Sequence, residues 1–376
     1  MTGIMKKIGI ITYHNAINYG AALQSKALFD YLTINYQNCE FEIINYVNDK
    51  IANSKKIKSI IKNKKFNSKQ KFKQILGTLM TSIQVRRFKK YLKNVKYSRI
   101  YTNKNIKDIE NIYDFFIIGS DQVWNYKINN NDDNYLLDFI KNKKRVFTYA
   151  SSLGLSKIDE EHKNKFKKTI AFYNKISMRE KEGKDLVEKI TERDITLVLD
   201  PVFLMLSSWK KNYASKYKNK KIVTLYLFNT EYIKISNQII KNKPEYLIDK
   251  INGNITFSDF FKKNVKVGTT YGPEEFLKSI VNSSFILTDS FHCVAMSIIF
   301  HKDFVVFLDN KIMETNSRMH NLLKIAGLED RIYDSKVDIE KLKPIDWNKV
   351  DENIKSYRED SVKYIEEIIK EINSGV

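Results

Sequence analysis

The 376-residue chain contains only two cysteines, Cys39 and Cys293, and only four prolines. Two cysteines so far apart form neither a disulfide framework nor a structural zinc site, which fits a reducing cytoplasm. No metal site is predicted, because no group of His, Asp or Glu residues has ligand spacing. The scarcity of proline and glycine argues against a long flexible linker. We interpret Cys293 as a small buried thiol rather than a nucleophile.

The sequence also lacks long apolar runs and a leader pattern. No hydrophobic stretch approaches the ~20 residues that a membrane-spanning helix needs. Residues 1–7 lead into the first predicted strand without a signal-peptide pattern. We therefore expect a cytoplasmic protein. A chain of this length, 43% of it hydrophobic, can bury the cores of two ordinary domains.

Acidic residues are missing between Asp49 and Asp108, a stretch in which lysines and arginines recur, and the whole chain carries a net charge of +21. Apolar residues are interleaved at helical spacing, so we predict a basic helical insertion at about 51–105. We rank three explanations: a compositional bias first, peripheral contact with an anionic membrane second, and nucleic acid last. No nucleic-acid partner is expected, because the common nucleic-acid-binding motifs are missing.

Short apolar runs alternate with helical patterns along the chain, which predicts an α/β protein with mostly parallel sheets. In the first half we expect strands at 7–12, 40–46, 115–118, 145–149, 175–178 and 196–199, and helices at 21–36, 67–95, 160–173 and 181–190. In the second half we expect strands at 221–227, 265–267, 285–288 and 304–307, and helices at 232–240, 273–281, 294–300 and 319–326.

This pattern predicts two Rossmann-like domains that face each other across a cleft. The N-terminal domain is placed at 1–205, with the basic insertion inside it, and the C-terminal domain at 206–345. Residues 346–376 contain a long helix pattern with a polar face, and we expect that helix to cross back onto the first domain.

The segment after the first predicted strand contains the polar residues His14, Asn18 and Tyr19, followed by Gly20. Gly20 lets a helix begin close to whatever fills the loop. Open α/β sheets bind ligands at this edge, so His14 is a candidate contact, and Asn18 and Tyr19 are candidates for hydrogen bonds to a polyhydroxylated ligand. The stretch is not G-x-G-x-x-G, so no dinucleotide site is indicated. The alternative is a capped turn between strand and helix.

Two further strand ends carry functional candidates. Ser120, Asp121 and Trp124 follow the strand at 115–118, and Trp124 could supply an aromatic platform for a sugar. Arg179 follows the strand at 175–178, and its planar guanidinium suits a carboxylate or a phosphate. A salt bridge to a neighbouring acid is the alternative for Arg179.

The segment 286–293, ILTDSFHC, predicts a buried strand, a short turn and a helix start. His292 would then lie at the carboxyl end of a strand and at a helix N-terminus, where free N–H groups can bind an anion. Asn316 and Arg318 stand in a polar turn before the helix at 319–326, with Ser317 as its expected N-cap. Arg179, His292 and Arg318 together suit a small substrate that carries both a carboxylate and a phosphate.

These segments resemble the polysaccharide pyruvyl transferase family. The resemblance rests chiefly on GSDQVWN at 119–125 and TDSFH at 288–292, with NYGA at 18–21, YASSLG at 149–154, SMRE at 177–180, DPVFL at 200–204 and NSR at 316–318, in the family's order. It implies a GT-B-like fold and the transfer of a pyruvyl group from phosphoenolpyruvate to a sugar, giving a cyclic ketal. The sugar would belong to a cell-surface polysaccharide or its lipid-linked precursor. No cofactor is expected beyond the donor substrate.

The resemblance also implies roles for individual residues. His292 would be the catalytic acid or acid/base, and Arg179 would bind the donor. Ser290, also expected at the substrate, stands where some members of the family have an arginine, which leaves Arg318 as the candidate replacement. Two alternatives remain open: a GT-B glycosyltransferase with a nucleotide-sugar donor, and a non-catalytic scaffold at the membrane surface.

Overall fold

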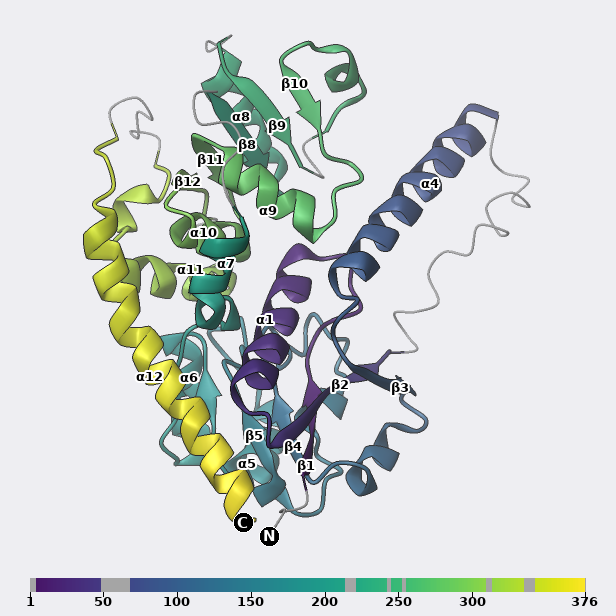
Figure 1. The fold of residues 1–376 in the computed structure, drawn as a ribbon, viewed down its shortest axis with the longest axis vertical. Coiled ribbons are helices and arrows are strands. Elements are labelled where there is room, and N and C mark those ends of the chain that lie inside the picture. Colours follow the sequence, from purple (N-terminus) through teal and green to yellow (C-terminus); the bar gives the residue numbers. More distant parts are fainter. Residues whose placement is uncertain are drawn as a thin grey trace.

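The computed structural model describes residues 5–48, 68–213, 221–241, 245–251, 255–308, 313–334 and 342–375. Two α/β halves lie one above the other in Figure 1, and a long helix runs along both of them. The part of the predicted basic insertion at 51–67 lies outside the described residues. Within the described ranges, no helix is both long enough and apolar enough to cross a membrane.

The N-terminal half is built on a five-stranded parallel sheet with strand order β3-β2-β1-β4-β5. Its strands are β1 (Lys6–Ile11), β2 (Cys39–Tyr46), β3 (Tyr97–Tyr101), β4 (Phe115–Ile118) and β5 (Val146–Thr148). A short parallel pair, β6 (Ser177–Met178) and β7 (Thr196–Leu197), follows. Single bridges connect its segment to the β5 segment, Phe147 with Lys175 and Ser151 with Met178. The helices are α1 (Tyr19–Asn35), α4 (Ser68–Tyr91), α5 (Glu160–Thr169) and α6 (Lys181–Thr191).

The C-terminal half repeats this arrangement with strand order β10-β9-β8-β11-β12, again all parallel. Its strands are β8 (Ile222–Tyr226), β9 (Leu247–Lys250), β10 (Val265–Val267), β11 (Phe285–Thr288) and β12 (Asp303–Val306). The helices are α7 (Leu206–Asn212), α8 (Thr230–Lys241), α9 (Pro273–Asn282), α10 (Phe291–Ile299) and α11 (Met313–Ala326). The prediction of two Rossmann-like sets is therefore confirmed.

The central strands are apolar along their whole length. All four residues of β4 are buried, as expected for a parallel strand whose two faces are both covered. Two strands were not predicted, β3 and β9. In β3, Arg99 and Ile100 are exposed because the strand forms an edge of its sheet, and β9 contains the charged pair Asp249 and Lys250. Neither sequence has the apolar pattern that identifies a strand.

The predicted C-terminal helix is α12 (Trp347–Ser374), which spans both halves (Figure 1). Asp346 caps its start by accepting from two backbone N–H groups, and it ends at Gly375, whose φ of 77° favours glycine. Val350 and Ile354 pack into a core that contains C-terminal elements. Further along, 364–372 packs into the core of the first sheet. The helix therefore crosses back onto the N-terminal half, as predicted.

The two halves also share apolar core. Tyr19, at the start of α1, stacks on Phe276 of α9 with ring centroids 4.4 Å apart. The Tyr19 hydroxyl donates to the carbonyl oxygen of Tyr271 (3.0 Å). Phe88 of α4 lies in the same cluster. These contacts hold the loops at the ends of the two sheets against each other.

Candidate active site

Each sheet changes winding direction beside a central strand. β1 lies between β2 and β4, and β8 lies between β9 and β11. Ligands of open α/β sheets bind at the carboxyl ends of the strands at such a point. The loops after β1 and β4 contain the predicted residues around 14–20 and 120–124, and the loop after β11 leads to His292.

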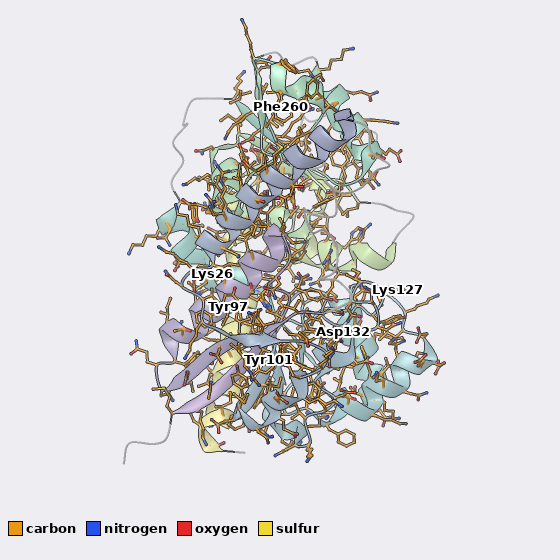
Figure 2. All side chains as sticks on the ribbon, turned by 90° about the vertical axis from the view of Figure 1, so that its right-hand side faces the viewer. Lys26, Tyr97, Tyr101, Lys127, Asp132 and Phe260 are labelled. Carbon is orange, nitrogen blue, oxygen red and sulfur yellow. The ribbon has the colours of Figure 1, made fainter. Side chains whose placement is uncertain are left out.

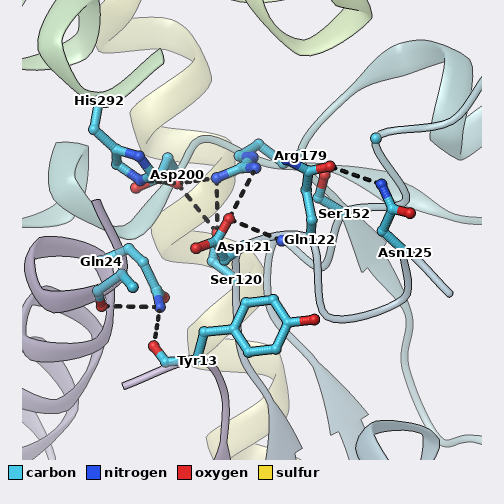
Figure 3. A network of polar contacts seen from close by, with 12 residues as sticks. Tyr13, Gln24, Ser120, Asp121, Gln122, Asn125, Ser152, Arg179, Asp200 and His292 are labelled. Carbon is cyan, nitrogen blue, oxygen red and sulfur yellow. Dashed lines mark hydrogen bonds and ion pairs between the residues drawn. The ribbon is translucent and has the colours of Figure 1, made fainter. Parts of the chain in front are cut away.

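Asp200, which follows β7, lies at the centre of the polar network in Figure 3. Its Oδ2 accepts a hydrogen bond from Arg179 Nη1 (2.7 Å) and another from the hydroxyl of Ser120 (3.1 Å). The same oxygen is 3.5 Å from Nε2 of His292. Asp200 and Arg179 are both buried, at 1% and 3% exposure, so solvent screens this pair little. One carboxylate thus connects the predicted arginine and histidine.

The charges of this network shift the pKa values of its members. Burial alone would raise the pKa of the Asp200 carboxyl, but His292 and Arg179 outweigh burial and hold that pKa well below its ordinary value. Burial would lower the pKa of Arg179, but Asp200, Asp121 and Glu180 raise it. Asp200 is therefore an anion and Arg179 a cation throughout the physiological range.

Two guanidinium groups lie over one aromatic ring at the start of α10. The central carbons of Arg179 and Arg318 are 4.5 and 5.9 Å from the ring centroid of Phe291. Burial and then the charge of Arg179 lower the pKa of Arg318 to about 10. With the Gln122 amide oriented so that its oxygen accepts, both terminal nitrogens of Arg318 donate to it, at 3.0 and 2.5 Å. An anionic ligand between the two cations would relieve their repulsion.

The imidazole of His292 is held from one side by Gly20. A Cβ added at Gly20 would lie 2.1 Å from Nδ1 of His292, so only glycine allows α1 to approach this closely. Nε2 of His292 is buried and makes no hydrogen bond within the described residues. In Figure 3 the ring points toward Asp200. The backbone of α1 and the carboxylate of Asp200 therefore fix the orientation of the ring.

A cavity of about 410 Å³ adjoins this network, and we call it the tyrosine cavity. Its lining includes Tyr13, Tyr46, Tyr135, His14, Asn18 and Asp121. Asp121, with a φ of 74°, is also 3.9 Å from Arg179 Nη2. Asp121 therefore places the tyrosine cavity next to the arginine and histidine cluster.

Two predicted ligand contacts are wrong. Trp124 is 2% exposed and packs edge-on against Phe166 in the core under the first sheet, so its ring offers no platform to a sugar. Tyr19 is 1% exposed, and its ring and hydroxyl are engaged at the contact between the two halves. The sequence marks both as aromatic residues near a strand end, but it does not reveal that each points into a core.

The other predicted residues lie around the site in supporting positions. Asn18 lines the tyrosine cavity, while its side-chain oxygen caps α1 by accepting from the Ala21 N–H (3.1 Å). Ser290 is the N-cap of α10, but its side chain makes no capping hydrogen bond. The predicted N-cap role of Ser317 is wrong, because α11 begins at Met313, so Asn316 and Ser317 lie inside the helix.

Three supporting residues were not predicted. Asp200 stands in the DPVFL motif directly after the strand predicted at 196–199, where it also caps the turn that begins at Pro201. Glu180 is 1% exposed, and its carboxylate accepts from the Ser152 hydroxyl and from the N–H groups of Leu153 and Gly154. Gln122 contacts Arg318 as described above. Glu180 and Gln122 directly follow the predicted residues Arg179 and Asp121, and that position was the available indication for these two.

Both cysteines are buried, which confirms the prediction of a buried thiol at Cys293. Cys293 is fully buried, and burial raises the pKa of its thiol to about 12. Cys39 is 7% exposed at the start of β2. Within the described part of the chain, no group of three or more His, Cys, Asp or Glu residues is placed to hold a metal ion.

His14 gives a test of stability against pH. The ring is 5% exposed, 3.0 Å from the Thr12 carbonyl oxygen and 3.2 Å from Asn45 Oδ1, and burial lowers its pKa from the ordinary 6.5. As the pH falls through 6.5, His14 takes up a proton in the unfolded chain before it does so in the folded one, so the free energy of unfolding decreases. The loss is about 1.4 kcal/mol for each pH unit by which the folded-state pKa lies below the unfolded-state value. Urea unfolding at pH 7.5 and 5.5 should show a smaller loss for His14→Gln than for the native chain. An equal loss in both would contradict a buried neutral His14.

Comparison with known proteins supplies the family and the fold of this chain. A model of the polysaccharide pyruvyl transferase family matches residues 18–310. No curated protein matches the chain in sequence. Among solved structures, UDP-GlcNAc 2-epimerase from Neisseria meningitidis bound to UDP-GlcNAc superimposes with a TM-score of 0.55 at 12% identity, covering 97% of this chain and 100% of that one. A Listeria monocytogenes structure assigned as a UDP-N-acetylglucosamine 2-epimerase gives 0.56 at 9% identity, covering 95% and 89%.

These structural matches, at such low identity, establish a two-domain fold of the GT-B type and nothing about substrates. The family match covers more than half of the chain. The chain therefore belongs to the polysaccharide pyruvyl transferase family and is a transferase of polysaccharide biosynthesis.

Proposed function

We propose that the enzyme transfers the pyruvyl group of phosphoenolpyruvate to two hydroxyls of one sugar, forming a cyclic ketal. The observation that carries this proposal is the convergence of Arg179, Arg318 and His292 around Asp200 and Phe291, beside the tyrosine cavity. Phosphoenolpyruvate bears a carboxylate and a phosphate. Two guanidinium groups can bind both, each through a planar fork of donors.

The donor would bind to N–H groups that have no hydrogen-bond partner in the part of the chain that the structure describes. Nε and Nη2 of Arg179 have no hydrogen-bond partner within the described residues, although Glu180 and Asp121 lie 4.0 and 3.9 Å away. Helix α10 begins at Phe291, directly before His292, so the free N–H groups of its first turn belong to the same segment as the imidazole and can bind an anion. Ser290 stands at the N-cap of this helix with a side chain that makes no capping hydrogen bond, and Arg318 supplies the second cation.

The chemistry needs one group that moves protons. His292 as an imidazolium would protonate the methylene carbon of phosphoenolpyruvate, leaving positive charge on the neighbouring carbon. A sugar hydroxyl adds to that carbon and gives its proton to the imidazole. The second hydroxyl then forms the other ketal bond as the carbon–oxygen bond to phosphate breaks, and its proton leaves on inorganic phosphate. Asp200 would stabilise the imidazolium from 3.5 Å.

The tyrosine cavity suits the acceptor. Its walls combine the rings of Tyr13, Tyr46 and Tyr135 with polar groups such as Asn48 and Asn129. Aromatic faces pack against the C–H faces of sugars, while amides bind hydroxyls. We propose that the acceptor is carried on a lipid and that the enzyme meets it at the cytoplasmic membrane face. The basic surface of α4 supports this, since Arg86, Lys89 and Lys90 are exposed on it.

The donor assignment is tested by ligand binding and by product analysis. Phosphoenolpyruvate should raise the melting temperature, with about 2.7 kcal/mol of added stability at 100 times Kd. Arg318→Gln should weaken this binding about tenfold or more, because a charge-assisted contact of about 1.5–3 kcal/mol is lost. The matched control is Arg99→Gln, an exposed edge-strand arginine paired with Asp108.

Turnover with a saccharide acceptor should release inorganic phosphate and add a pyruvate ketal, seen as a defined mass increment. Release of free nucleotide from a panel of nucleotide sugars, with no response to phosphoenolpyruvate, would instead establish the glycosyltransferase alternative.

A further inference from the structure

A second cavity, of about 340 Å³, lies between α4, the loop after β1 and β3, and we call it the α4 groove. Its floor is apolar, formed by Val85, Phe88, Leu92 and Val95. Two lysines, Lys89 and Lys93, stand exposed on its rim. Figure 2 looks onto this side of the molecule, where Tyr97 of β3 lies below α4.

The α4 groove and the tyrosine cavity share a wall. His14, Asn15 and Ala16 line both. The loop is held in place, because the His14 ring contacts the Thr12 carbonyl oxygen and Asn45, and its centroid is 5.4 Å from that of Tyr97. At its other side the tyrosine cavity reaches Asp121, next to Arg179. The reactive cluster, the tyrosine cavity and the α4 groove therefore follow one another in that order.

Among the residues that the structure describes, the two rim lysines lack the ion-pair partners that Lys26 and Lys96 have. Lys26 pairs with Asp30 and Lys96 pairs with Glu40, whereas neither Lys89 nor Lys93 forms an ion pair within the described residues. Two unpaired cations beside an apolar floor match a ligand that has a phosphate group next to a hydrocarbon chain. A free sugar would need neither feature.

We infer that the α4 groove binds the diphosphate and the first isoprenoid units of a lipid-diphosphate-linked saccharide, whose sugar occupies the tyrosine cavity. This rests on the proposed function and assigns the lipid-proximal part of its acceptor to a specific surface. Lys89 and Lys93 contact the phosphates, while Phe88 and Leu92 pack against the chain. The order of the cavities then presents the sugar hydroxyls to Arg179 and His292.

Farnesyl diphosphate is the probe, measured by calorimetry with the full-length chain. The double variant Lys89→Gln/Lys93→Gln should weaken its binding at least tenfold. The control Arg86→Gln/Lys90→Gln removes the same charge from exposed positions on the same helix that do not line the groove. It should leave the affinity within about twofold of the native value. Farnesol and inorganic diphosphate should each bind much more weakly than farnesyl diphosphate. Farnesol can contact only the apolar floor, and diphosphate can contact only the two lysines.

Three results would overturn the inference. Equal losses in the two double variants would mean unspecific attraction to a basic helix. Native farnesyl diphosphate binding in Lys89→Gln/Lys93→Gln, with lost binding to phosphatidylglycerol vesicles, would make the lysines a membrane contact instead. No binding by the native chain would exclude the site altogether. Stabilisation by phosphoenolpyruvate, measured in parallel, reports on the donor site alone, so failure of the proposed function stays distinguishable from failure of this inference.

Discussion

His292→Ala is expected to abolish ketal formation, with a loss in kcat of about a hundredfold to ten-thousandfold, the range for a positioned general acid or base. The folded state should persist, because Asp200 keeps its hydrogen bonds from Arg179 and Ser120 when the imidazole is removed. Phosphoenolpyruvate should still stabilise the variant, since the two arginines remain. Phosphate release and mass spectrometry of the saccharide measure the first effect, and thermal shift measures the second.

The control for this variant is His162→Ala. His162 lies on α5, where it stacks on Tyr126 and contacts Asp159 at the surface, so its loss should leave kcat unchanged. Gly20→Ala should act in the same direction as His292→Ala, because its Cβ would displace the imidazole. Ketal formation at the native rate by His292→Ala would remove the histidine from the mechanism.

The arrangement of strands was predictable because each central strand is a continuous apolar run between polar turns. The bounds of β4 and β11 agree with the prediction at every residue. β3 and β9 were missed because their charged residues find partners that only the folded chain supplies. Asp249 accepts from the hydroxyls of Tyr271 and Ser279, and Lys250 pairs with Asp259.

The location of the site was predictable for a topological reason. Parallel strands end on one edge, so polar residues that follow different strands converge, as Arg179 and His292 do on Asp200. The direction of an aromatic side chain in a loop follows no such rule. Trp124 and Tyr19 lie within three residues of Asp121 and Asn18, which line the tyrosine cavity, yet their own side chains pack into cores. Asp200 was overlooked because an Asp-Pro pair after a strand is also the ordinary start of a capped turn, and Asp200 does accept from the Val202 N–H in this way.

Asp200→Asn should have the largest effect on stability in this site. The carboxylate balances the buried guanidinium of Arg179, and breaking a buried ion pair costs about 3–5 kcal/mol. Because the pKa of Asp200 is held below its ordinary value, its stabilising charge is present above about pH 4 and is lost as the pH falls through the depressed pKa. The difference between the native chain and Asp200→Asn in urea unfolding should therefore be full at neutral pH and shrink in acid.

Asp259→Asn separates this structural cost from a role in the reaction. Asp259 is also fully buried and paired with lysines, Lys250 and Lys262, but it lies in the C-terminal half among residues outside the Asp200 network. Both variants should lose stability, whereas only Asp200→Asn should also lose activity per folded molecule, because the imidazolium of His292 loses its counter-charge. Equal activity per folded molecule in the two variants would limit Asp200 to a role in stability. Activity lost only with Asp200→Asn, while phosphoenolpyruvate stabilises that variant as it does the native chain, would make the carboxylate a positioning residue for His292 and not only for Arg179.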